Sequence, residues 1–406
     1  MENIIKATKA KESVEEISGV KLLIVGIQHL FTMFGATVLV PLTTGMNVSV
    51  ALFTAGVGTL LFHLITRFEV PIFLGSSFAY IAPIILVSKN MGGLQYAQGG
   101  IIVAGLLYVV FAALVKIIGA EKIKKLLPPI VTGPIIMVIG LNLAPTAVNM
   151  ASENWLLAGI AFATVVVVNM YAKGFFKVIP VLFGLAAGYI ASAILGYVDY
   201  TPIIEAKWFA MPAFTFPKFS WDAIAVIAPV ALVTAIEHIG DVLSVSETVG
   251  KDFIKRPGLS VTLLGDGLAT ALAALLGGPA NTTYSENTGV LALTKIYNPV
   301  VMEIAAISAI CISVIGKFGA VISTIPQPVI GGISIVLFGM ISSIGIKTIV
   351  NNNLDFGKTR NLLIAATILV LGIGGAVFDL GGNIKLAGMS LGAIAGIILN
   401  LILPEE

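Results

Sequence analysis

The residues best suited to chemistry lie in the run ANTTYSENTGVLALTK, residues 280–295, where Glu286 stands in an otherwise apolar chain. A charge in a membrane-apolar chain must be bound, paired or protonated, so such a residue marks a candidate functional site. Polar neighbours, among them Asn281, Thr282 and Thr283, leave this stretch too short and too interrupted for a full helical span. The pattern predicts a discontinuous helix whose N-terminus faces a buried cavity.

A pair of acidic residues, Glu237 and Asp241, lies in the run AIEHIGDVLSVSETV. Residues four apart share one face of a helix, so two like charges would lie within one turn. Such a pair favours a carboxyl that is protonated at rest, and therefore proton coupling. His238, in the same run, is expected to be a packing residue, and Asp266, between two glycines, a helix-packing or capping residue. His29 is open to two interpretations, a proton-coupling residue or a hydrogen-bonded packing residue.

The composition indicates which solvent surrounds the chain. Of 406 residues, 57% are hydrophobic and 11% charged, whereas a soluble domain carries roughly 25% charged residues. The mean hydropathy is +1.03, which is typical of a polytopic membrane protein. A net charge of +2 is too small to indicate nucleic acid, and three histidines with the single Cys311 exclude a disulfide framework or a cysteine-rich metal site. We therefore expect neither metal nor cofactor.

Fourteen apolar runs follow a mixed-charge N-terminal segment, residues 1–21, which is expected to be cytoplasmic. A helix needs about 20 apolar residues to cross a bilayer, and most runs approach that length. The first seven lie near residues 22–43, 49–66, 70–88, 98–118, 126–148, 156–171 and 178–198. The second seven lie near residues 222–245, 258–276, 282–295, 299–316, 328–346, 361–379 and 386–403.

The positions of lysine and arginine predict the orientation, because these residues prefer cytoplasmic loops. With alternating spans and a cytoplasmic N-terminus, 18 of the 23 basic residues fall on the cytoplasmic side. The opposite orientation would invert this ratio. We therefore expect a multi-pass protein of the cell membrane with both termini in the cytoplasm.

Two sets of seven spans enter the membrane in opposite senses, which predicts an all-α fold of two inverted repeats. The first and eighth runs carry Gln-His and Glu-His at matching places, namely Gln28, His29, Glu237 and His238. Short hydroxyl-rich segments also match between the third and tenth runs, namely residues 75–78 and 281–284. Interrupted segments at corresponding positions of two halves indicate a transporter binding site. A proline-bearing connection, residues 201–220, separates the halves.

The run ENTGVLALTK resembles the signature of the nucleobase:cation symporter 2, or nucleobase-ascorbate transporter, family. The blocks QHLFTMFGATVLVPLTTG, GSSFAYIAPI, AIEHIGD and IPQPVIGGISIVLFGMI resemble its uracil permease branch. The resemblance implies a core domain, residues 22–118 and 222–316, and a gate domain, residues 126–198 and 328–403. It also implies that segments 3 and 10 begin as short strands before turning into half-helices.

The same resemblance implies that Glu237 and Glu286 contact a pyrimidine and that the backbone amides of Phe78 and Gly289 face its ring, while Tyr284 is placed to pack on it. Uracil is a flat neutral ring with two N–H donors and two carbonyl acceptors, which carboxylates and backbone amides complement. Glu286 lies where the free N–H groups of a helix start favour an acceptor. The expected proton-coupling residues are Glu237, Asp241, Glu286 and His29.

The predicted function is a proton-coupled symporter that imports uracil, and not an enzyme, since no nucleophile with a base or metal-ligand set recurs. Its partners would be a nucleobase, protons and the lipid bilayer, with a homodimer allowed and no nucleic acid. A purine, xanthine or urate, is the alternative substrate, because the uracil branch has histidine at the position of Asp241. Glu286 speaks against a purine, because the purine branch more often has glutamine at that position. A channel is disfavoured because the polar residues cluster at one depth, and an anion transporter because the segments around 78 and 286 lack a central basic residue.

Overall fold

The computed structural model describes residues 18–379 and 385–404, and most of its regular structure is helical. The predicted N-terminal segment, residues 1–21, lies outside the described residues up to residue 17, as do residues 380–384 of the predicted gate domain. The first half contains α2 Gly19–Thr44, α3 Val48–Ile65, η1 Phe78–Tyr80, α4 Ile81–Asn90, α5 Leu94–Ile118, α6 Ala120–Leu126, α7 Pro129–Ser152, α8 Trp155–Tyr171, η2 Gly174–Val178 and α9 Pro180–Ile194.

The second half also contains both long and short helices. It contains α10 Thr201–Glu205, α11 Trp221–Ile227, α12 Val230–Val249, η3 Ile254–Gly258, α13 Leu259–Leu275, α14 Ser285–Thr294, α15 Val300–Ser313, α16 Gly316–Ser323, α17 Gln327–Asn351, α18 Thr359–Ile373 and α19 Gly388–Ile402. The predicted run 222–245 is broken between α11 and α12, because Pro229 has no N–H to donate to the preceding turn.

Seven helical segments among the described residues are long and apolar enough to cross a membrane, as expected for a multi-pass membrane protein. They are Gly19–Thr44, Val48–Ile65, Leu94–Ile118, Pro129–Ser152, Trp221–Val249, Ile254–Leu275 and Gln327–Asn351. The turn between the first two is set by the sequence. Gly45 ends α2 in the left-handed region with φ 79°, and the side chain of Asn47 accepts the N–H of Val50 at 3.0 Å to begin α3.

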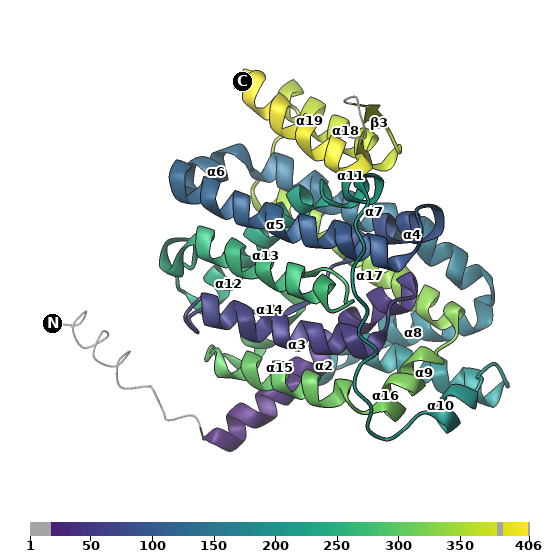
Figure 1. Ribbon diagram of the computed structural model, residues 1–406. Coiled ribbons are helices and arrows are strands. Elements are labelled where there is room, and N and C mark those ends of the chain that lie inside the picture. Colours follow the sequence, from purple (N-terminus) through teal and green to yellow (C-terminus); the bar gives the residue numbers. More distant parts are fainter. Residues whose placement is uncertain (1–17, 380–384, 405–406) are drawn as a thin grey trace.

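The helices pack in two groups (Figure 1). In one, α3 lies between α13 and α15, and α13 also packs along α5. In the other, α17 packs along α7 and α8, with α18 and α19 beside α7. Close contacts depend on glycine: a Cβ on Gly105 of α5 would lie 2.6 Å from the carbonyl oxygen of Gly267 in α13. Small residues at such crossings let helix backbones approach, which is how membrane helices gain packing contacts.

Two short antiparallel strand pairs complete the described fold. β1 Leu74–Ser76 pairs with β2 Asn281–Thr283, in the register Leu74↔Thr283 and Ser76↔Asn281. β3 Val377–Asp379 pairs with β4 Lys385–Ala387 near the C-terminal helix. The strands predicted at the start of segments 3 and 10 are therefore present, and they bring two distant parts of the chain together.

Candidate functional site

The β1–β2 pair is buried, and side chains from neighbouring helices complete its hydrogen bonds. Oγ1 of Thr59 accepts the N–H of Leu74 at 2.9 Å. Oγ1 of Thr270 donates to the carbonyl of Asn281 at 2.8 Å, and the amide nitrogen of Asn281 donates to the carbonyl of Thr54 at 3.1 Å. Irregular backbone is tolerated at membrane depth only where protein satisfies its polar groups. The threonines of α3 and α13 therefore stabilise the strand crossing.

Tyr284 lies at this crossing and is 3% exposed. Its hydroxyl donates to the carbonyl of Ser76 at 2.9 Å. A Cβ on Gly75 would lie 2.4 Å from Cζ of the Tyr284 ring, so glycine is required there by the close approach. The observed role of Tyr284 is thus to hold the two strands together. Its contact with a substrate ring stays a prediction.

Each strand leads into a short helix, α4 after η1 in the first half and α14 in the second. Glu286 lies in the first turn of α14, where the leading backbone N–H groups have no partner within the helix. Neighbouring protein atoms desolvate the Glu286 carboxyl, yet part of the residue stays exposed, so its side chain is accessible to a ligand. Gly289, one turn further, is also exposed, and beyond its chain neighbours and the backbone of its own helix no atom lies within 4 Å of its ideal Cβ position.

Glu237, on α12, lies close enough to Glu286 for the two charges to interact. It is half-buried, and its electrostatic neighbours include Glu286, Asp241 and Asp266. Its Oε2 atom is buried and accepts no hydrogen bond from the described residues. A buried carboxylate oxygen without a donor is costly. Glu237 therefore offers an acceptor that a proton or a ligand N–H would satisfy.

Asp241, one turn beyond Glu237, binds the second half-helix directly. Its Oδ2 accepts from Oγ1 of Thr283 at 2.7 Å, and its Oδ1 accepts from the hydroxyl of Ser285. These two bonds connect α12 to the end of β2 and the start of α14. Both carboxylate oxygens are needed, and a neutral histidine at this position would offer only one acceptor. Asp241 is therefore a positioning residue for the segment that carries Glu286.

His29, on α2, also holds α14 in place, through Asn287. It is fully buried, and the amide nitrogen of Asn287 lies 3.0 Å from its Nδ1 and 3.1 Å from its carbonyl oxygen. The donated bond assigns Nδ1 as an acceptor, which corresponds to a neutral ring. The geometry thus favours the packing interpretation in which His29 orients Asn287. A role in proton coupling stays a prediction.

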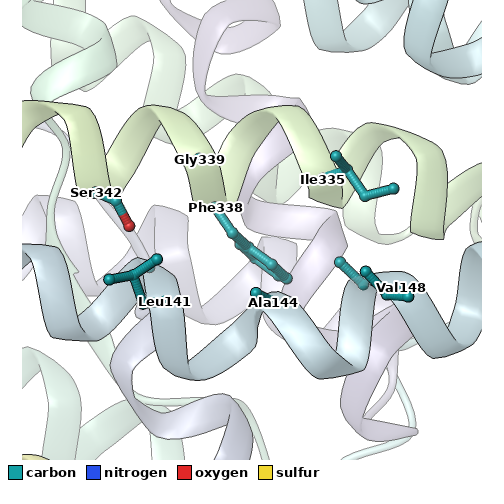
Figure 2. Close-up of a pocket in the computed structure, with 9 residues that line it drawn as sticks. Leu141, Ala144, Val148, Ile335, Phe338, Gly339 and Ser342 are labelled. Atoms are coloured by element: carbon teal, nitrogen blue, oxygen red, sulfur yellow. The ribbon is translucent and has the colours of Figure 1, made fainter. Parts of the chain in front are cut away.

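Phe78 faces the other helix group. It is 7% exposed, and its ring packs edge-on against Phe338 of α17, with centroids 5.9 Å apart. Phe338 also lines a cavity of about 110 Å³ between α7 and α17 (Figure 2). The cavity wall is apolar apart from Ser342 and holds no ionisable residue, so the cavity is distinct from the space beside the carboxylates. The Phe78–Phe338 contact joins the predicted core domain to the predicted gate domain.

Next to Glu237 on α12 lies His238, which forms a buried pair with Asp266 of α13. Nδ1 of His238 is 3.0 Å from Oδ2 of Asp266, and both side chains are fully buried. The hydroxyls of Tyr80 and Thr234 lie 3.4 Å apart in the same region. The carboxylate of Asp266 therefore connects α13 to α12 through His238.

The groups that the fold brings together suit a small planar ligand that both donates and accepts hydrogen bonds. Glu237 and Glu286 supply acceptors from two different elements. The free N–H groups at the starts of η1, with Phe78 first, and of α14 supply donors. Gly289 is the fifth residue of α14, where the N–H bonds back to the carbonyl four residues earlier. Gly289 therefore offers room for a ligand and not a free donor.

Comparison with known proteins supports a transporter. A model of a family described as the "Permease family" matches residues 20–380. The chain is 48% identical over 393 residues to the uracil permease of Bacillus caldolyticus, covering 93% of this chain and 91% of that protein. It is 45% identical over 399 residues to the uracil permease of Bacillus subtilis (strain 168), covering 93% and 92%. The uracil permease of Escherichia coli (strain K12) is 40% identical over 398 residues, covering 94% and 92%.

Solved structures share the fold at low sequence identity. The transmembrane domain of the cyanobacterial bicarbonate transporter BicA matches with a TM-score of 0.64 at 16% identity, over 92% of this chain and 96% of that one. The murine Slc26a9 anion transporter matches with a TM-score of 0.71 at 10% identity, over 97% and 69%. At these identities the similarity establishes a common fold and not a common substrate.

Proposed function

We propose that this chain imports uracil together with protons. The proposal rests on its family, because the chain belongs to the Permease family described above, which is the nucleobase:cation symporter 2 family. Membership makes the protein a transporter and not an enzyme. The observation that carries the proposal is the proximity of two carboxylates, the half-buried Glu237 and the exposed Glu286 in the first turn of a half-helix. The names of the relatives point to uracil as the substrate.

In the proposed complex, uracil lies between α12 and the first turn of α14. The carboxylates of Glu237 and Glu286 accept its two ring N–H groups, and free N–H groups at the starts of η1 and α14 donate to its carbonyls. Phe78 closes one side, where it already packs on Phe338. Tyr284 supports the strand crossing beneath, and Gly289 keeps room for the ring.

Proton coupling follows from the charge at the site. Glu237, Asp241 and Glu286 are three carboxylates close together in a desolvated region, with no basic side chain bonded to any of them among the described residues. Binding a neutral substrate here is favoured when one carboxylate takes up a proton, because like charges then no longer repel. Since Asp241 is committed to two hydroxyl donors, we assign the transported proton to Glu237 or Glu286. Proton and substrate then raise each other's affinity.

We propose fourteen membrane segments in two inverted sets of seven, in the cell membrane and with both termini in the cytoplasm. Each predicted apolar run overlaps a described helix, which supports the count. The matched order of a strand followed by a helix of 10 residues supports the repeat, with β1 and α4 in one half and β2 and α14 in the other. Transport would move the core domain, residues 22–118 and 222–316, against the gate domain, residues 126–198 and 328–403.

The anion-transporter fold of the structural relatives raises a second candidate substrate class. An anion site needs a cation or several free N–H groups, and here the half-helix start faces carboxylates instead. This charge disfavours an anion. A purine remains the alternative within the family, since Asp241 stands where the uracil branch has histidine.

Uptake into proteoliposomes tests the assignment. With an inward proton gradient, we expect labelled uracil to accumulate, unlabelled uracil to compete strongly, and xanthine and cytosine to compete poorly. Cytosine presents a donor where uracil presents an acceptor, which leaves buried groups unpaired. Glu237→Ala removes one of the two proposed acceptors for uracil. Its matched control is Glu247→Ala, at the exposed end of α12, which removes a carboxylate from the same helix outside the site. Xanthine outcompeting uracil would transfer the assignment to a purine.

A further inference from the structure

The connection between the two halves is seated on the helix ends at one face of the molecule. Residues 206–220, which we call the strap, run without a helix or a strand from α10 to α11, and Figure 1 shows this teal segment crossing the stacked helices. Its N–H groups and carbonyls bond to three helix ends. Lys218 donates to the carbonyl of Gln95 at 2.9 Å, Ala210 to that of Val314 at 3.0 Å, and Gly316 donates to that of Trp208 at 3.0 Å.

Three glycines from three different elements form the seats. A Cβ on Gly99 of α5 would lie 2.1 Å from the carbonyl oxygen of Lys218. On Gly277, just after α13, it would lie 2.4 Å from Oγ1 of Thr215, and on Gly316, at the start of α16, 2.5 Å from the carbonyl oxygen of Lys207. Any side chain at these positions would push the strap away. The strap therefore has a built docking surface along the helix ends.

Side-chain bonds fix the middle and the beginning of this path. The amide nitrogen of Gln98 donates to Oγ1 of Thr215 at 2.9 Å and to the carbonyl of Gly277 at 3.0 Å. The ammonium of Lys317 donates to the carbonyls of Ile203 and Ile204 at the end of α10. The strap is thus held at both the α5–α13 and the α15–α16 ends.

The outer side of the strap is strongly apolar, in contrast to an ordinary surface connection. Six large apolar side chains in and at the end of the strap are 59–78% exposed, namely Trp208, Phe209, Met211, Phe216, Phe219 and Trp221. Lys207 and Lys218 accompany them and are also exposed. Within the described part of the chain, no element covers these aromatic rings.

We propose that the strap docks on the lipid interface of the bilayer, with its aromatic rings at the level of the headgroups. Three observations favour lipid as the occupant. The strap crosses the ends of membrane-spanning helices, where the bilayer boundary must lie. Aromatic rings with lysines match the composition of interfacial belts. Many backbone groups of the strap are free of protein partners, which suits the wet headgroup region and not the hydrocarbon core. In the proposed topology this is the outer leaflet.

Tryptophan fluorescence tests the proposal on the full chain. The protein has three tryptophans, Trp155, Trp208 and Trp221. Trp155→Phe leaves only the two at the strap. This variant is reconstituted in vesicles whose phospholipids carry bromine, a quencher of tryptophan, either near the headgroup or near the methyl end of the acyl chain. We expect bromine near the headgroup to remove most of the emission and bromine at the chain end to remove less.

A second variant separates docking from simple proximity. Phe209→Ser with Phe216→Ser, added to Trp155→Phe, removes apolar anchors while leaving both reporters, and we expect clearly weaker quenching by bromine and stronger quenching by aqueous iodide. Full quenching by iodide without any by bromine in the parent would place the strap in water. Protection from both quenchers would mean that protein, such as a second copy of this chain, covers the strap. Either of these results would overturn the proposal.

Discussion

The bonds from Asp241 to Thr283 and Ser285 give the sharpest structural prediction, because they connect the helix of Glu237 to the half-helix of Glu286. Thr283→Val removes one donor and keeps the branched shape, and Ser285→Ala removes the other. A hydrogen bond to a charged group contributes about 1.5–3 kcal/mol and one between neutral groups about 0.5–1.5 kcal/mol. This free energy holds the start of α14 in the conformation that binds uracil. Losing about 1.4 kcal/mol of it weakens uracil binding about tenfold. We therefore expect each single variant to bind uracil about tenfold more weakly.

Isothermal titration calorimetry with uracil measures this on the purified protein, in the parent and in an Asp241→Ala background. Thr294→Val is the matched control, since Oγ1 of Thr294 donates at 2.8 Å to the carbonyl of Val290 within the same helix, outside the Asp241 contacts. Once Asp241 is gone, the Thr283 and Ser285 substitutions should have almost no further effect, because the shared acceptor is absent. Equal losses in both backgrounds would refute the positioning role of Asp241.

Three further predictions concern the ligand, the space and the topology. Glu286→Ala should weaken uracil binding at least about tenfold, because an unpaired buried N–H donor costs about 1–3 kcal/mol; binding like the parent would show that this carboxylate is structural. Gly289→Val should lower affinity and leave the thermal midpoint near that of the parent, whereas Gly75→Val should lower the midpoint because its side chain meets Tyr284; the reverse pattern in a thermal-shift assay would contradict the assigned space. In a cysteine-free background, Glu153→Cys, at an exposed turn between α7 and α8, should react with an impermeant thiol reagent from outside and the exposed Lys122→Cys from inside; labelling from the same side would contradict the fourteen-segment topology.

Local patterns in the sequence predicted much of this architecture. Apolar runs located the helices, and the polar interruption around Glu286 located a half-helix that the structure begins at Ser285. The short strand before it was implied by family resemblance and is present as β2. These features depend on neighbouring residues, or on motifs that a family carries, and both are readable without coordinates.

The contacts that position the site could not be derived in the same way. Helical spacing places Glu237 and Asp241 on one face, but it does not reveal that Asp241 turns to hydroxyls more than 40 residues away. The packing of Phe78 on Phe338 joins segments from the two halves, and sequence spacing carries no distance between them. Long-range contacts of this kind depend on how the helices pack, so they appear only in the folded chain.

The central claim is that uracil and protons cross the membrane together, and proton movement driven by uracil tests it most directly. Proteoliposomes without any initial pH gradient, containing a pH-sensitive dye, receive an inward gradient of uracil in sodium-free medium, with a potassium ionophore to hold the membrane potential at zero. Symport predicts acidification of the lumen that requires the protein, follows the uracil gradient and is lost in Glu286→Ala. Uracil entry at a normal rate with no change in luminal pH, or with a requirement for sodium, would contradict the account.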